Sequence, residues 1–120
     1  MTIREFAVPT DRELIDQLGI TFDDEGPGRY GIVRAFDLTA NNGDVMKISY
    51  DIPGGSFRYR WSQGGQLISD SFREGAVLLK AYFVGEDIAI SVTFDTDGLR
   101  GSLEITVGDA IKVRDEMFFS

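Results

Sequence analysis

The sequence of 120 residues contains no cysteine and no histidine. Without cysteine there is no disulfide, no thiolate nucleophile and no cysteine-bound zinc or iron–sulfur centre, so folding requires no oxidising compartment. Without histidine there is no imidazole to act as a general base or a metal ligand, which excludes a Ser-His-Asp hydrolase. We therefore expect a protein that is not an enzyme and that uses no cofactor and no metal.

Basic residues are scarce, because 12 Lys and Arg stand against 20 Asp and Glu and leave a net charge of −8. A nucleic-acid-binding surface needs cations to displace counterions from phosphates, and an anionic membrane surface also attracts basic residues. Long apolar runs are missing too, so we find neither a signal peptide nor a membrane span. The sequence predicts a cytoplasmic protein that binds no nucleic acid directly and no membrane.

The length and the 42% share of hydrophobic residues are typical of one domain, covering residues 1–120. One short helix is predicted near the start. The side chains of Thr10 and Glu13 form a capping box, and Gly19 is a typical helix end. Apolar residues recur between them at helical spacing, at Leu14, Ile15 and Leu18.

Beyond residue 30 the pattern changes to an alternation of apolar and polar residues, which predicts strands joined by short hairpin turns. The segment Val77 to Val84 is apolar on both sides except at Lys80, so we expect a central strand there. Residues 66–74 keep no single period and fit either a bulged strand or a second helix. The predicted fold class is mainly β (α+β): a short N-terminal helix followed by an antiparallel meander of 7–8 strands, forming an open barrel or a two-layer sandwich.

Acidic residues are concentrated in two segments. Residues 11–26 hold six acids and one arginine, and residues 84–98 hold four acids and no basic residue. A solvated surface explains such runs, and so does a docking surface for a basic protein, because charge speeds association and selects partners. The acidic candidates for partner contact are Asp23, Asp24, Glu25, Glu86 and Asp87.

Aromatic and arginine residues alternate between Phe57 and Trp61, which places the aromatic side chains on one side of a strand and the arginines on the other. The aromatic side can form part of the core. Alternatively, Tyr59 and Trp61 anchor a partner at the rim, since tyrosine and tryptophan are enriched in interface hot spots.

Arg34 interrupts an otherwise apolar strand face. A buried, unpaired guanidinium would be costly, so we expect Arg34 to pair with a carboxylate of the first acidic segment or to face a cavity. In the second case it would hold an anionic group of a ligand in a cavity lined by Phe36 and Tyr50.

These observations favour a non-catalytic protein-binding module, a small acidic inhibitor such as a bacterial immunity protein that neutralises a basic toxin. The alternative is an up-and-down β-barrel that carries a small ligand, in the manner of a lipocalin. An uncovered edge strand would also allow a weak homodimer.

Overall fold

The structure, a computed structural model, describes residues 5–23, 33–96 and 98–119. The strands form two four-stranded sheets, with the orders β1-β2-β3-β4 and β5-β6-β7-β8, and neighbouring strands are antiparallel. The elements are α1 (Asp11–Leu18), β1 (Val33–Thr39), β2 (Val45–Asp51), β3 (Ser56–Gln63), β4 (Gln66–Glu74), β5 (Ala76–Val84), β6 (Asp87–Thr96), β7 (Leu99–Val107) and β8 (Ile111–Phe119).

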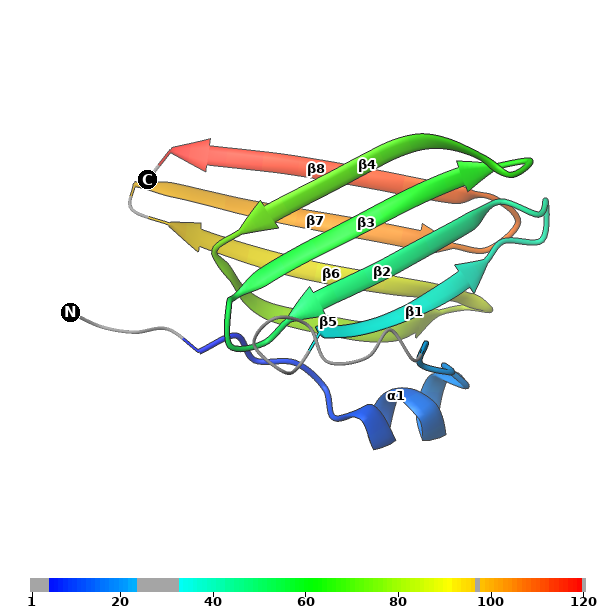
Figure 1. Cartoon of the computed structure of the whole chain (residues 1–120), viewed down its shortest axis with the longest axis horizontal. Coiled ribbons are helices and arrows are strands. Elements are labelled where there is room, and N and C mark those ends of the chain that lie inside the picture. The colour runs from blue at the N-terminus through cyan, green and yellow to red at the C-terminus, as the bar shows by residue number, and fades with distance from the viewer. Residues whose placement is uncertain (1–4, 24–32, 97, 120) are drawn as a thin grey trace.

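The two sheets form a sandwich, which confirms one of the two predicted architectures. Figure 1 shows the β1–β4 sheet lying across the β5–β8 sheet, with α1 beside β1 and β5. Residues 66–74 form a strand and not a helix, and the β3–β4 register shifts where Trp61 pairs with Ser69 and Ser62 with Leu67, as the predicted alternative of a bulged strand had it. Large side chains from both sheets fill the space between them, among them Phe36, Met46, Ile48, Tyr50, Phe57, Leu79, Ile90 and Ile105.

The predicted helix is confirmed as α1. The backbone N–H of Glu13 donates to the Thr10 hydroxyl at 3.1 Å, and Gly19 ends the helix with a φ of 68°. Leu14 and Leu18 are buried, whereas Ile15 of the predicted apolar stripe is exposed. Within the described ranges, no helix is long and apolar enough to span a membrane.

The prediction that residues 77–84 form a central strand is wrong, because β5 lies at the edge of its sheet. Its first half is covered by the N-terminal segment: the Ala7 N–H donates to the Val77 carbonyl at 3.0 Å, and the Leu79 N–H donates to the Ala7 carbonyl at 2.8 Å. This coverage and the nearby helix α1 explain the apolar residues of the first half. They do not explain those of the second half.

Candidate partner-binding surface

The second half of β5 exposes three consecutive large apolar side chains. Tyr82, Phe83 and Val84 are 40%, 52% and 55% exposed. Gly85 then turns the chain with a φ of 62°, and Glu86 and the first residue of β6 follow. An apolar strip of this kind on a monomer is typical of a surface that a partner covers.

An acidic hollow of about 340 Å³ lies next to this strip, where the β1–β2 turn meets the β5–β6 and β7–β8 turns. Glu86, Asp87 and Asp109 supply its carboxylates. The sequence predicted the first two of these as contact residues and missed Asp109, whose proximity depends on the pairing of β6 with β7, where Ile88 lies opposite Val107. The full lining is Leu38, Thr39, Asn41, Glu86, Asp87, Ile88, Val107, Gly108 and Asp109.

Hydrogen bonds between two turns hold the hollow in shape. The Asn41 N–H donates to the Gly108 carbonyl at 2.8 Å, and the Asn42 N–H donates to the Asp109 carbonyl at 3.0 Å. The Asn41 side-chain amide also donates to the Asp109 carboxylate at 2.9 Å. The Asp87 carboxylate lies so close to Gly108 that a β-carbon there would collide with it. The Asp109 carboxylate is therefore held in position before any partner arrives, and the Asp87 carboxylate lies against Gly108.

The acidic segment 11–26 is partly paired within the chain. Asp23 lies 3.6 Å from the Lys47 ammonium, and its backbone N–H donates to the Ala35 carbonyl at 2.7 Å. Asp24 and Glu25, the other two predicted contact residues of this segment, lie outside the described residues. Asp23 thus helps to cover the edge of β1.

Arg34 pairs with the first acidic segment, as one of the two predictions had it. Its guanidinium lies 2.6 Å from the Asp11 carboxylate and 4.3 Å from the centre of the Phe22 ring. Phe36 and Tyr50 lie in the core with their ring centres 6.4 Å apart, and neither lines the acidic hollow. The two separate four-stranded sheets also do not form the barrel that a lipocalin-like carrier requires.

The aromatic residues of β3 face the interior. Tyr59 is 8% exposed, and its hydroxyl lies 3.4 Å from the Ser69 hydroxyl. Trp61 is half-buried and donates from Nε1 to the Asp44 carboxylate at 3.3 Å. Burial leaves little of Tyr59 for a partner to contact, and Trp61 holds a buried acid. We therefore leave both out of the proposed contact surface.

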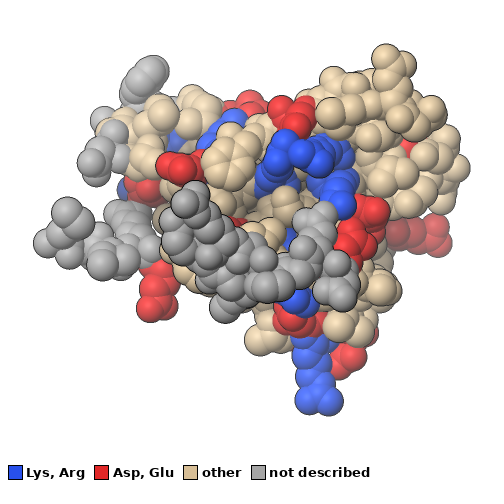
Figure 2. Space-filling view, in the orientation of Figure 1, with Lys and Arg blue, Asp and Glu red and all other residues tan. Residues whose placement is uncertain are grey.

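The outer face of the β1–β4 sheet has a different charge character. Figure 2 shows a group of basic side chains on this face with acidic side chains beside them. Arg58 donates to both oxygens of Asp70, at 3.0 and 2.8 Å, and Arg60 lies 3.5 Å from the same carboxylate. The hydrogen bonds from Arg58 hold the pKa of Asp70 below its usual range. Charges on this face largely balance one another.

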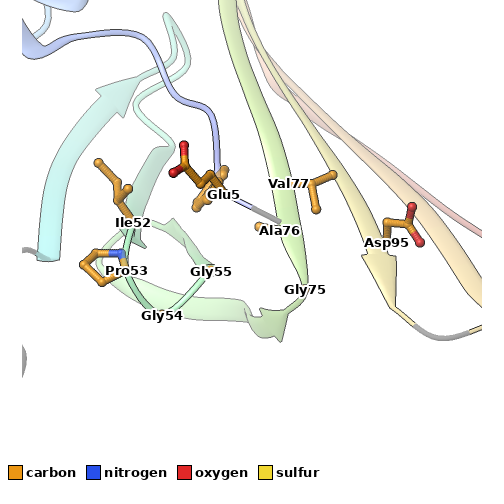
Figure 3. Close-up of a pocket in the computed structure, with 10 residues that line it drawn as sticks. Glu5, Ile52, Pro53, Gly54, Gly55, Gly75, Ala76, Val77 and Asp95 are labelled. Carbon is orange, nitrogen blue, oxygen red and sulfur yellow. The ribbon is translucent and has the colours of Figure 1, made fainter. Parts of the chain in front are cut away.

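A second hollow, of about 540 Å³, lies at the opposite end of the sandwich, where β4 passes into β5 (Figure 3). Gly54, Gly55 and Gly75 form much of its wall. Its two carboxylates, Glu5 and Asp95, come from the N-terminal segment and β6 and lie apart in Figure 3. Within the described ranges, no cluster of three or more Asp and Glu side chains is arranged to hold a metal ion.

These features define the class of the protein as an antiparallel two-sheet sandwich with one capped N-terminal helix. No family model and no curated protein matches the sequence. Among solved structures, the fold is similar to that of a chain in the "Contact-dependent growth inhibition toxin - immunity protein complex from Klebsiella pneumoniae 342". The likeness has a TM-score of 0.77 at 17% identity and covers 98% of this chain and 100% of that one. At this identity it shows the shared fold.

Proposed function

We propose that this chain is an immunity protein, which binds and neutralises a growth-inhibiting toxin. The observation that carries the proposal is the likeness to a chain of a toxin–immunity complex, because it extends over nearly the whole length of both chains. A fold by itself does not define a function, so the choice also rests on charge and side-chain chemistry.

The composition supports the immunity chain over the toxin chain. With a net charge of −8 and neither histidine nor cysteine, this chain is poorly suited to attack a nucleic acid or to act by nucleophilic catalysis. It suits an inhibitor that works by binding in the cytoplasm. The partner we propose is a basic protein, because opposite charge speeds association and improves selectivity.

A growth assay tests this function. Expression of this chain alone should leave bacterial growth unchanged. The protein encoded next to its gene should arrest growth when expressed alone, and co-expression of this chain should restore growth. Growth arrest caused by this chain, or arrest by the neighbouring protein that this chain does not relieve, would contradict the proposal.

We also propose a weak homodimer through β4. None of its nine residues is buried, and Ile68 and Phe72 are exposed. Antiparallel pairing of two copies about Asp70 would place Ile68 of each copy opposite Phe72 of the other, which is a favourable apolar contact. The same pairing places the two Asp70 carboxylates opposite each other, so the dimer should be weak.

A further inference from the structure

The second half of β5 has the sequence of a buried strand in the position of an edge strand. Apolar side chains occupy both of its faces, as in strands that lie between two others. Among the described residues, the covering contacts of Ala7 end at Leu79, and Tyr82, Phe83 and Val84 remain exposed. When local sequence and fold disagree in this way, the place is expected to have a functional role.

Two of the other edge strands, β1 and β8, are protected in ordinary ways. The segment at Asp23 covers β1, and β8 exposes the charged side chains of Lys112, Arg114 and Glu116. Charged residues on an edge strand discourage pairing with other chains. The edge strand β4 also exposes apolar residues, but the arginines of β3 lie beside it. The β5 strip differs because the charged residues of the turn that follows it are all acidic, while Lys80, the basic residue of β5, lies before Tyr82 at the other end of the strip.

Charge near the strip indicates what covers it. The residues that line the adjacent hollow include three carboxylates, from Glu86, Asp87 and Asp109, and no basic side chain. A desolvated apolar contact with a charged rim is the usual anatomy of a protein interface. A partner surface that complements the strip and the hollow therefore carries an apolar side chain beside a Lys or Arg side chain.

We propose that β5 from Tyr82 onward, together with the acidic hollow, is the surface on which the toxin docks, and that the toxin inserts a Lys or Arg side chain between Glu86, Asp87 and Asp109. This inference rests on the proposed immunity function. The hydrogen-bonded turns around the hollow lower the cost of binding, because the Asp109 carboxylate is already held by Asn41 and need not be ordered on association. Phe83 and Val84 supply the apolar contact beside the hollow.

The test measures binding of an inactive variant of the neighbouring gene's product to purified variants of this chain. Glu86→Lys reverses a charge in the hollow, and Phe83→Ser removes apolar contact from the strip. Asp87 and Asp109 are left unchanged, because each contacts a neighbouring turn. Matched controls are Glu104→Lys on the outward face of β7 and Phe72→Ser on β4, both at exposed positions.

Glu86→Lys should raise the dissociation constant at least about tenfold, mainly by slowing association. The association rate of this variant should also depend less on salt when NaCl is raised from about 50 to about 300 mM. Phe83→Ser should speed dissociation about tenfold or more. Both controls should stay within about twofold of the wild type. Circular dichroism and melting temperature verify that each variant is folded.

If the β5 variants bound the toxin with unchanged affinity, or if the controls lost as much affinity, the proposed docking surface would be wrong while the immunity function remained intact. Failure of the wild-type chain to bind the toxin would instead overturn the function and this inference with it. A second copy is the other possible occupant. A wild-type dimer that Phe83→Ser dissociates, with toxin affinity unchanged, would assign the strip to self-association and contradict the proposal.

Discussion

At the scale of single residues, the hydroxyl of Tyr50 is a buried polar group. Its side chain is 2% exposed, and its hydroxyl has no hydrogen-bond partner in the part of the chain that the structure describes. Its pKa is raised to about 12, mainly by burial and to a smaller extent by the charge of Asp11, while Arg34 acts to lower it. The hydroxyl therefore contributes little to folding at neutral pH.

Replacing Tyr50 with phenylalanine should leave the free energy of unfolding at pH 7 unchanged or raise it by about 1 kcal/mol, since an unsatisfied hydroxyl is removed. At alkaline pH the wild type and Tyr50→Phe should differ in their free energy of unfolding. The folded pKa of Tyr50 lies above the unfolded value near 10, so its ionisation leaves the free energy of unfolding unchanged below about pH 10 and lowers it as the pH rises toward 12.

Urea unfolding from about pH 9 to 12 measures this difference. The wild-type unfolding free energy should fall more steeply than that of Tyr50→Phe, by up to about 1.4 kcal/mol per pH unit. If the free energies of unfolding of the wild type and Tyr50→Phe changed in parallel with pH, the pKa of Tyr50 would not be raised. A loss above about 2 kcal/mol at pH 7 would show that its hydroxyl has a partner.

Gly75 joins the two sheets between β4 and β5 with a φ of 84°. A β-carbon there would collide with the methyl group of Thr96. Gly75→Ala should therefore lower the free energy of unfolding by about 2 to 4 kcal/mol, from backbone strain and steric overlap together.

Gly64→Ala is the matched control, because Gly64 also has a positive φ, of 55°, but open space around the added carbon. Gly64→Ala should lower the free energy of unfolding by only about 1 to 2 kcal/mol. Equal losses of stability in urea unfolding of the two variants would show that contact with Thr96 is unimportant.

At the scale of elements, sequence patterns predicted a helix or strand well where all the residues of the pattern lie within that element. The capping box and glycine stop define α1, because its hydrogen bonds form within the segment itself. The alternation of apolar and polar residues located most strands, since one face of each sheet is buried. Residues 66–74 gave no clear pattern because β4 buries neither face.

Sequence could not show which strands lie at sheet edges. Periodicity reports burial, and the apolar run in β5 therefore predicted two neighbouring strands, whereas among the described residues β5 is flanked by β6 and a short N-terminal contact. The division into two sheets depends on the chain crossing at Gly75, which is a tertiary feature. The exposed strip of Tyr82, Phe83 and Val84 could be found only once that division was known.

The weak dimer is a prediction about β4 as an element. Sedimentation velocity should show concentration-dependent self-association that Phe72→Lys abolishes, because a lysine would replace the apolar contact with Ile68 of the second copy. Phe83→Lys on β5 is the control and should self-associate like the wild type. A wild-type chain that stays monomeric up to about 1 mM, a concentration at which an interaction of about −4 kcal/mol is visible, would rule out this pairing.

At the scale of the whole molecule, the net charge of −8 is distributed unevenly. Acidic side chains gather at the turns around the hollow, while the outer face of the β1–β4 sheet carries arginines paired with Asp70 (Figure 2). The sequence pointed to Glu86 and Asp87 through charge alone. It also suggested Tyr59, whose burial depends on the other sheet, and it missed Asp109, which only strand pairing brings near.

The central claim is that this chain binds a toxin tightly enough to neutralise it. Isothermal titration calorimetry with an inactive variant of the neighbouring gene's product tests it most directly. We expect a one-to-one complex with a dissociation constant of about 1 nM or tighter, equivalent to about −12 kcal/mol. No detectable binding at about 10 µM of each protein would contradict it.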